Sequence, residues 1–436
     1  MTGEEIMEQY RESYSSVKPD IAKGIEKYRK ADAMLIIVDR NGNPLPGVSL
    51  KIRQKTHAFD FGCNALMLGQ LGKDNEIYEQ KFLNLFNLVT TTLCWSITET
   101  EPGKFRFAEG SEEIFRRPPA DRVRNFAKKH SLRFKGQPLL ADSWYPDWAS
   151  RNKEELMQQY SNYFKTVAER YRDDLYIVDV VNESNYCRER TPDFPLLEDG
   201  ELSYVEWALR KADEFFPDTC ILERNEGTEV NIRKSKERYF QQNQKLLSDG
   251  VRLNSIGFQF HMLSDAEISE HLKCNYLTPK ELFDNYMDFC RLGIPMYISE
   301  VTVPSRVSWL SREEGEQMQA EVIENLYHLW FSVPNMNGII YWNLKDGPAW
   351  KKEGDVLGCL LDSQMCEKPS YQTLYQLINR KWKTHIDAVS AEDGSYAFRG
   401  FKGQYDVEFC ADGREQSFTF ELKEDMREPY KLKAVF

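Results

Sequence analysis

Two glutamates stand at the ends of strand-like apolar runs, and their positions indicate acid–base chemistry. Glu183 closes the run in YIVDVVNESNY (176–186), and Glu300 closes the run in PMYISEVTVPS (295–305). Cleavage of a glycosidic bond uses two such carboxyl groups: one is protonated and donates to the leaving oxygen, and the other is ionised and attacks or stabilises the sugar. A single glutamate at a strand end is more often solvated or ion-paired, so the hypothesis depends on both residues converging.

Polar neighbours of the two glutamates could orient a substrate. Asn182 precedes Glu183, and its amide is suited to a hydrogen bond with a sugar hydroxyl. Gln259 and His261 lie two residues apart in IGFQFHM (256–262), so both side chains point to the same face of a strand. A histidine that is bonded to a carboxylate can fix its orientation and charge. The alternative for His261 is a hydrogen-bonded histidine of the core.

Aromatic residues make up 13% of the chain and could stack on sugar rings. Trp144, Trp342 and Trp350 are the candidates for substrate contact, and Trp148 is a fourth aromatic residue of the same kind. Packing in the core is the competing interpretation for each tryptophan. Asp142 could accept hydrogen bonds from two adjacent sugar hydroxyls, and a turn or capping role before SWYPDW (143–148) is its alternative.

These side chains need a scaffold that brings strand ends together. Eight strand-like runs alternate with helical patterns, which include 153–172, 229–249, 279–292 and 312–331. The runs are 59–66, 88–95, 133–140, 175–182, 219–224, 255–261, 295–300 and 337–343. This count predicts an α/β fold, a (β/α)8 TIM barrel whose strand carboxyl ends carry the active residues. A doubly wound sheet is the alternative, but it would have to be very wide.

The two ends of the chain differ from the barrel region at 57–381. Residues 1–31 are predicted as an N-terminal helix, with the apolar stripe in 4–30, and 32–56 hold two β runs around an Asn-Gly-Asn-Pro turn. Residues 382–436 alternate apolar and polar side chains at period two. Neither flank can bury a core alone, so both are predicted to combine in one small β-sandwich. Two unrelated β appendages are the alternative.

Composition narrows the functional class. The net charge of −12 disfavours a nucleic-acid partner, because phosphate binding requires a basic face. Nine scattered cysteines without a CxxC pair form neither a disulfide framework nor a zinc site, and no motif indicates a metal or cofactor. No apolar run is long enough to span a membrane, and no signal peptide is seen. We expect a cytoplasmic protein, or a secreted one if a leader was removed; the oligomeric state stays open.

Several segments, taken in order, resemble motifs of glycoside hydrolase family 10, the endo-β-1,4-xylanases. They are VDVVNES (178–184), IGFQFHM, YISEVTV (297–303) and YWNLKDGPAW (341–350), and the resemblance extends over about 34–430, including the β flanks of plant-type members. It implies that Glu183 is the acid/base and Glu300 the nucleophile. It also implies that Gln259 and His261 hold the nucleophile side of the site, and that Trp342 and Trp350 wall the sugar.

The match fails at the second and third strands. Where the family reads Gly-His-Thr-Leu-Val-Trp-His, this chain has Gln137, Ala141 and Asp142 in place of the first His, the Trp and the second His. Leu93 and Ser96 stand where the family supplies an Asn and a Lys to the glycone side. Each lost contact of this kind costs about 1–3 kcal/mol. We therefore expect an altered sugar specificity.

The sequence predicts a retaining β-glycoside hydrolase that acts on β-1,4-xylan or a related β-linked plant glycan by double displacement. Retention predicts that the carboxyl groups lie about 5–5.5 Å apart. Two alternatives stay open. The first is a carbohydrate-binding protein on a decayed barrel that no longer hydrolyses its ligand. The second is an exo-acting β-glycosidase with another sugar specificity.

Overall fold

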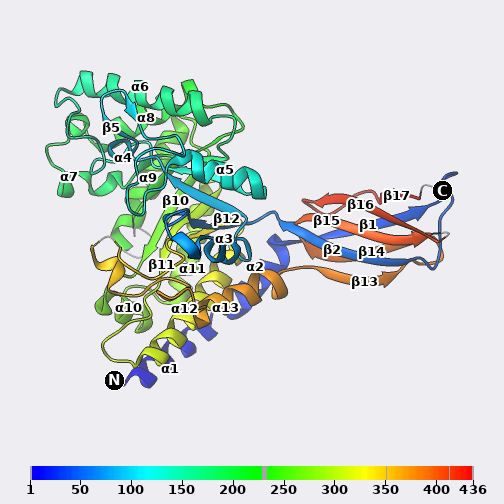
Figure 1. Cartoon of the computed structure of the whole chain (residues 1–436). Helices are drawn as coiled ribbons and strands as arrows, with labels where there is room; N and C mark the ends of the chain where they lie inside the picture. Colours follow the sequence, from blue (N-terminus) through cyan, green and yellow to red (C-terminus); the bar gives the residue numbers. More distant parts are fainter. Residues whose placement is uncertain (1, 228–232, 350, 412, 435–436) are drawn as a thin grey trace.

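A closed barrel of eight parallel strands forms the centre of the computed structural model, which describes residues 2–227, 233–349, 351–411 and 413–434 (Figure 1). The strands, in chain order, are β3 (Asp60–Asn64), β4 (Leu88–Thr92), β7 (Arg133–Gln137), β8 (Ile177–Asn182), β9 (Ile221–Glu226), β10 (Ser255–His261), β11 (Met296–Thr302) and β12 (Met336–Tyr341). Neighbours in the chain are neighbours in the barrel, and β12 closes it by pairing with β3. The predicted TIM barrel is confirmed, with all eight runs in place.

Helices cover the outside of the barrel, and one follows each barrel strand in the chain. They are α3 (Asn75–Leu83), α5 (Ala120–His130), α6 (Lys153–Tyr171), α8 (Glu201–Phe215), α9 (Arg233–Ser248), α11 (Pro279–Phe289), α12 (Arg312–Ser332) and α13 (Pro369–Gln376). Two of them begin at capping boxes, Thr278 with Glu281 and Ser311 with Glu314, which satisfy the first free N–H groups of the helix. No helix in the described part of the chain is long and apolar enough to cross a membrane.

Shorter elements lie mostly in the loops that follow the strands. They are α4 (Trp95–Thr98), β5 (Glu99–Glu101), β6 (Lys104–Phe105), α7 (Cys187–Arg190), α10 (Asp265–Leu272) and the single turns η1 (Gly72–Asp74), η2 (Ser184–Tyr186), η3 (Pro195–Leu197), η4 (Cys290–Leu292), η5 (Lys351–Gly354) and η6 (Leu377–Lys381). Most of these loops extend the carboxyl-end face of the barrel, where active residues are expected.

The predicted β-sandwich is also present, and each of its sheets mixes strands from both chain ends. One sheet has the order β14 (Ser395–Phe401), β1 (Lys30–Val38), β17 (Tyr430–Lys433). The other has the order β13 (His385–Val389), β2 (Ser49–His57), β15 (Gly403–Ala411), β16 (Arg414–Leu422). Buried apolar side chains such as Leu35, Ile52 and Val407 fill the space between the sheets. The two N-terminal runs thus lie in different sheets.

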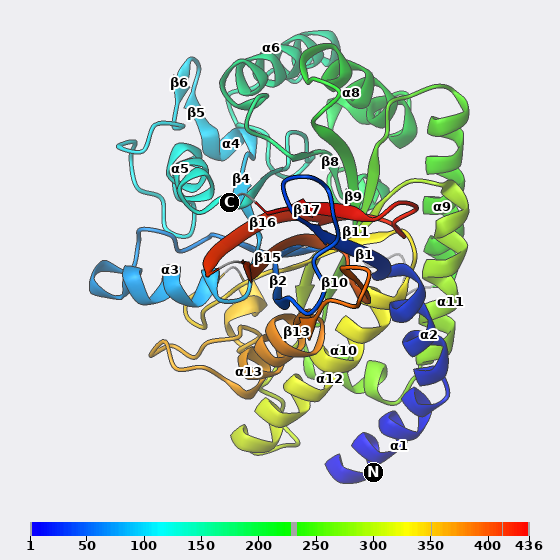
Figure 2. The same ribbon diagram turned by 90° about the vertical axis from the view of Figure 1, so that its right-hand side faces the viewer.

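The sandwich joins the barrel at the amino-terminal ends of its strands. β2 ends at His57 and β3 begins at Asp60, so the strands run away from the sandwich (Figures 1 and 2). Arg29 ties the two parts together: its guanidinium donates to the carbonyls of Phe331, at 2.6 Å, and Val333, and its own carbonyl accepts from the N–H of Lys402 at 2.9 Å. The sandwich is therefore remote from the carboxyl-end face.

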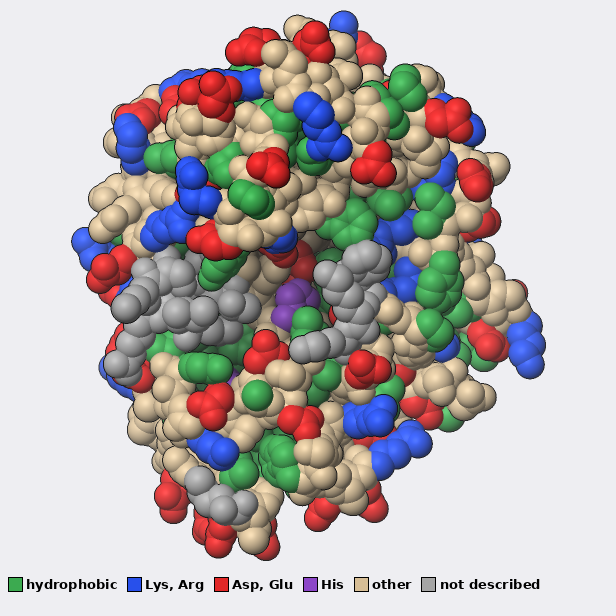
Figure 3. Space-filling view, turned by 90° about the vertical axis from the view of Figure 1, so that its left-hand side faces the viewer, with side chains coloured by type: hydrophobic (Ala, Val, Ile, Leu, Met, Phe, Trp, Pro, Cys, Tyr) green, Lys and Arg blue, Asp and Glu red, His purple; other side chains and the backbone are tan. Residues whose placement is uncertain are grey.

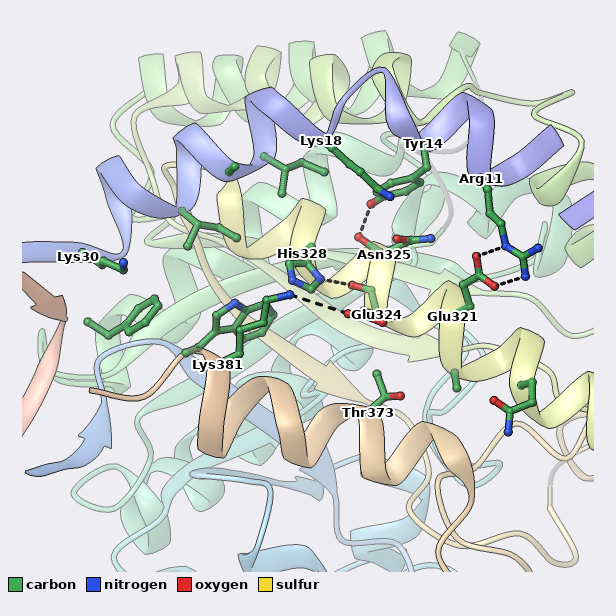
Figure 4. A pocket seen from close by; sticks show the side chains of 17 residues that line it. Arg11, Tyr14, Lys18, Lys30, Glu321, Glu324, Asn325, His328, Thr373 and Lys381 are labelled. Carbon is green, nitrogen blue, oxygen red and sulfur yellow. Dashed lines mark hydrogen bonds and ion pairs between the residues drawn. The ribbon is translucent and has the colours of Figure 1, made fainter. Parts of the chain in front are cut away.

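The N-terminal region differs from the single helix that the sequence predicts. It forms α1 (Gly3–Ser15) and α2 (Lys18–Tyr28), and Pro19 lies in the first turn of α2. Proline has no N–H for a preceding turn and disfavours helix just before it, which explains the break. Both helices lie along α12, where Arg11 pairs with Glu321 at 2.7 Å. A groove of about 870 Å³ separates them from α13 and η6 (Figure 4).

Gly24 allows α2 to approach α12 closely, and its substitution tests this contact. A Cβ at Gly24 would lie 2.4 Å from the carbonyl oxygen of Ser332. Alanine gains up to about 1 kcal/mol in helix propensity, whereas overpacking costs about 1–3 kcal/mol. We expect Gly24→Ala to lower the free energy of unfolding by about 1–2 kcal/mol in urea titrations.

The matched control is Gly110→Ala, because a Cβ at Gly110 meets no atom within 4 Å and its backbone is unstrained. That variant should unfold within about 0.5 kcal/mol of the wild type. Equal stability of the Gly24→Ala and Gly110→Ala variants would contradict the proposed close contact.

Candidate active site

The carboxyl-end face of the barrel has a hollow near its centre, with histidine and acidic side chains at its floor (Figure 3). Glu183 follows the last residue of β8, and Glu300 lies near the end of β11. Asn225 bonds to both residues: its amide donates to the Glu300 carboxylate at 3.1 Å, and its carbonyl accepts from the N–H of Glu183 at 2.9 Å. The two glutamates found in the sequence therefore converge on one face of the barrel.

Glu300 is buried, and side chains from three other strands donate hydrogen bonds to its carboxylate. Gln137 of β7 donates to Oε1, as do the amides of Asn225 and Gln259, each at 3.1 Å. The Nε2 atom of His261 lies 3.0 Å from Oε2. A buried carboxylate is costly unless it is hydrogen-bonded, and these four groups compensate for its burial.

His261 is placed by its neighbours on both sides of the ring. Its Nδ1 atom lies 2.9 Å from the hydroxyl of Thr302, and its ring meets the ring of Trp342 edge-on with 5.5 Å between centroids. Burial raises the pKa of Glu300, and the hydrogen bond and charge of His261 act in the opposite direction. His261 is therefore bonded to the carboxylate, as the sequence suggests, and is not an isolated core histidine.

Asn182 shares the network around Glu300 without touching that carboxylate. Its Oδ1 atom accepts from Asn225 at 2.8 Å and from Gln259 at 3.1 Å. These two bonds fix the orientation of the amide. The side-chain NH2 group has no hydrogen-bond partner among the described residues, and the side chain is half-buried. The NH2 group of Asn182 can therefore donate a hydrogen bond to a group that enters the hollow.

Glu183 lies on a sharp backbone turn. Its φ of 56° and ψ of 38° fall in the left-handed region, which costs about 1–2 kcal/mol for a residue with a side chain. Its N–H donates to the carbonyl of Asn225 at 2.9 Å. The side chain is 32% exposed, whereas that of Glu300 is 5% exposed. One carboxylate is therefore enclosed and the other is open to solvent.

A buried arginine network holds the turn that carries Glu183. Arg224 is fully buried; it donates to the hydroxyl of Ser184 at 2.9 Å and to Glu226 at 2.9 Å. The carboxylate of Glu226 in turn accepts from the N–H groups of Ser184, at 3.0 Å, and Asn185, at 3.1 Å. This network compensates for the strained backbone beside it.

Arg190 and Asp142 form a second support for Glu183. The guanidinium of Arg190 pairs with the Glu183 carboxylate and also with both oxygens of Asp142. Asp142 is 1% exposed and also accepts from the hydroxyl of Thr191 at 2.6 Å. This differs from the predicted substrate contact: protein donors take both carboxylate oxygens, so Asp142 anchors Arg190.

The predicted tryptophans have different surroundings. Trp342 is half-buried against His261, whereas Trp144 lies under the guanidinium of Arg117, 5.7 Å from the ring centroid. Trp148 packs edge-on against Trp95 and donates to the carbonyl of Glu99 at 3.3 Å. Trp350 lies outside the described residues. Trp144 and Trp342 thus remain candidates for sugar contact.

Sequence reasoning missed four residues of the site: Gln137 and Asn225 at Glu300, Arg190 at Glu183, and Arg224 below the turn. In the sequence, Gln137 stands out only as a departure from the family pattern, yet its amide donates to Glu300. The segment ERNE (223–226) could have indicated these contacts, because four charged or polar residues in a buried strand require hydrogen-bond partners on both faces of that strand. Nothing in the sequence pairs Arg190 with Glu183.

Comparison with known proteins finds endo-1,4-beta-xylanases among the similar sequences. Endo-1,4-beta-xylanase B of Thermotoga neapolitana is 26% identical over 322 residues, which are 71% of this chain and 86% of that protein. Endo-1,4-beta-xylanase C of Paenibacillus barcinonensis is 24% identical over 365 residues, 74% of this chain and 31% of that protein. The structure of xylanase 10B from Thermotoga petrophila RKU-1 in complex with xylobiose covers 74% of this chain and 95% of its own, with a TM-score of 0.62 and 23% identity.

That structural likeness supports the fold of the barrel. The sequence profile of Glycosyl hydrolase family 10 matches residues 58–377, which is most of the chain and includes every barrel strand and both glutamates. The chain therefore belongs to glycosyl hydrolase family 10.

Proposed function

We propose that the protein hydrolyses β-1,4-xylan or a related β-linked glycan with retention of configuration, with Glu300 as nucleophile and Glu183 as acid/base. The observation that carries this proposal is the unlike environment of the two carboxylates. Glu300 is buried and held by four donors, whereas Glu183 is partly exposed at the rim of the same hollow. The names of the matched relatives, endo-1,4-beta-xylanases, support xylan as the first substrate to test.

The hydrogen bonds of Glu300 suggest which oxygen attacks. Oε1 accepts from three donors and Oε2 from His261 alone among the described residues, so Oε2 keeps a lone pair for the anomeric carbon. In the first step Oε2 forms a bond to that carbon while Glu183 gives its proton to the leaving oxygen. In the second step Glu183 takes a proton from water, whose oxygen displaces Glu300.

The ion pair between Arg190 and Glu183 favours a second candidate function. The Arg190 guanidinium occupies the Glu183 carboxylate, which therefore does not face a leaving oxygen, and this arrangement fits a protein that binds a glycan without cleaving it. Hydrolysis requires the substrate to separate the pair, leaving Arg190 with Asp142. The two functions differ in whether any glycosidic bond is broken.

Product analysis tests the proposed function. The wild type should release oligosaccharides from xylan and form the β-anomer first, as seen by NMR, while Glu300→Gln should release none because an amide is not a nucleophile. Glu421→Gln, at an exposed residue of β16 in the remote sandwich, serves as the control and should keep wild-type activity. Binding of xylo-oligosaccharides by the wild type without release of products would favour the second function, and single sugars in place of oligomers would indicate an exo-acting enzyme.

The role of Glu183 predicts a dependence on the leaving group. General acid catalysis contributes about 10²–10⁴-fold, and mainly where the leaving oxygen is a poor leaving group. We expect Glu183→Ala to slow hydrolysis of xylo-oligosaccharides by this factor and to affect formation of the glycosyl-enzyme from a dinitrophenyl xylobioside much less, in pre-steady-state measurements. Equal losses on both substrates would exclude the assignment.

The role of His261 predicts a shift in the pH profile. Glu300 must be ionised to attack, and it is ionised above its pKa, which burial raises and His261 lowers. His261→Phe removes the opposing contribution, so the acid limb of kcat/KM against pH should move to higher pH. His385→Phe, in β13 of the sandwich, is the matched control and should leave the profile unchanged. An unchanged acid limb in the His261→Phe variant would show that this bond does not control Glu300.

A further inference from the structure

The loop that connects β6 to α5 contains a strained residue. Arg116 has a φ of 58°, in the left-handed region, which costs about 1–2 kcal/mol for a residue with a side chain. Gln70, in the loop after β3, holds this turn: it accepts from the N–H of Arg116 at 2.8 Å and donates to the carbonyl of Ile114 at 2.8 Å. Strain of this kind persists only where the surroundings impose it, and it is concentrated at functional sites.

The strained turn directs the guanidinium of Arg116 to another loop. The guanidinium donates to the side chain of Asn343 at 2.8 Å and pairs with Glu353 at 3.0 Å, and Asn343 donates to the same carboxylate at 3.3 Å. We call these three residues the Arg116 bridge. Because β3 lies between β4 and β12 in the barrel, the bridge passes over the carboxyl end of β3. It is a fixed barrier, since its side chains are bonded to one another.

A pocket of about 110 Å³ lies against the Arg116 bridge, and the bridge residues line it together with Asn64, the last residue of β3, and Phe115. One water needs about 10–15 Å³ on this measure, so the pocket has room for one sugar unit but not for a chain. Asn64 is 4% exposed, and its buried NH2 group has no hydrogen-bond partner among the described residues. An unpaired buried donor costs about 1–3 kcal/mol, so the pocket favours a ligand that supplies an acceptor.

The pocket lies next to the active site along the rim of the barrel. Asn343 directly follows Trp342, whose ring centroid lies 5.5 Å from that of His261. His261 is in turn bonded to Glu300 at 3.0 Å. The strands β10, β11, β12 and β3 are consecutive neighbours in the barrel, and adjacent strands lie about 4.8 Å apart. A glycan that places its end in the pocket can therefore extend its next units toward Glu300.

The lining of the pocket fits an uncharged sugar. The charges of Arg116 and Glu353 compensate each other, and the carboxylate of Asp346, which also lines the pocket, is paired with Lys368 at 3.0 Å. Phe115 is 57% exposed, so its ring is open to a ligand. Small-molecule sites combine apolar or aromatic side chains with a few polar groups that fix orientation. An aromatic ring and a free amide donor suit the face and the hydroxyl groups of a pyranose.

We propose that this pocket binds the terminal sugar of the glycan and that the Arg116 bridge stops the chain there, so that the protein cuts at a fixed distance from a chain end. The NH2 group of Asn64 donates to a hydroxyl of that sugar, and the ring of Phe115 covers its face. This inference deepens the proposed function and rests on it for the glycan class. It implies one main product length from oligosaccharides of different lengths.

The experiment compares two xylo-oligosaccharides of equal length that carry a bulky fluorophore, one at the reducing end and the other at the non-reducing end. Binding is measured by calorimetry in the Glu300→Gln background, together with the unlabelled oligosaccharide. One labelled ligand should bind as the unlabelled one does. The other should bind about 10–100-fold more weakly, because its label meets the Arg116 bridge. Equal binding of the two labelled ligands would overturn the inference.

Arg116→Gly should restore binding of the excluded ligand. Glycine adopts a φ of 58° without strain and lacks the guanidinium, so the turn is kept while the barrier is opened. A gain of binding also shows that the variant is folded. Arg399→Gln is the matched control, at an arginine that pairs with Glu26 at 2.8 Å in the remote sandwich, and it should leave the exclusion unchanged. Continued exclusion by the Arg116→Gly variant would contradict the role of the bridge.

Asn64→Ala and Phe115→Ala test the sugar contacts. Each should weaken binding of the unlabelled oligosaccharide about 5–20-fold, through loss of a hydrogen bond in one case and of an aromatic surface in the other. Tyr430→Ala, at an exposed aromatic residue of β17 in the sandwich, is the control and should bind as the unchanged protein does. Unchanged binding by both pocket variants would show that no sugar occupies the pocket.

These measurements separate the inference from the proposed function. If the wild type releases no product but one labelled ligand is excluded and Arg116→Gly relieves that exclusion, the proposed hydrolysis fails and the chain-end site stands. If hydrolysis occurs while both labelled ligands bind equally and products of many lengths appear, the chain-end site fails alone.

Discussion

The enclosed carboxylate of Glu300 is the constraint on which the rest of the site depends. A charge buried at the mouth of a barrel persists only if hydrogen-bond donors meet it from several directions. Those donors come from β7, β9 and β10, and they stand opposite β11 only because the barrel is closed. This closure brings Gln137, Asn225 and Gln259, which are far apart in the sequence, within hydrogen-bonding distance of the Glu300 side chain.

The carboxylate of Glu183 is stabilised in a different way from that of Glu300. It remains partly exposed, but its backbone is strained and is held by the buried network of Arg224 and Glu226. Two polar clusters thus lie on opposite faces of the strand β9, because Asn225 reaches Glu300 while its neighbours support the turn. One short strand therefore positions both carboxylates, which explains why it carries charge where a barrel strand is usually apolar.

Much of this arrangement follows from the sequence. The period of apolar residues predicts the eight strands and their helices. A glutamate after an apolar run marks the two strand ends that carry Glu183 and Glu300. The pairing of Arg190 with Asp142 and Glu183 does not follow, because it depends on how the loops after β7 and β8 fold over the face. The break between α1 and α2 was readable from Pro19, whereas the separation of β1 and β2 into two sheets depends on strands from the other end of the chain.

The interleaved sandwich has a consequence for how the polypeptide matures on the ribosome. Lys30 of β1 pairs with Phe401 of β14, and Leu50 of β2 pairs with Phe409 of β15. β1 and β2 are therefore translated long before their partner strands, and their edges stay unpaired while the entire barrel is synthesised. Loss of the last strands by truncation would therefore leave the edges of β1 and β2 without partners and open to pairing with another chain.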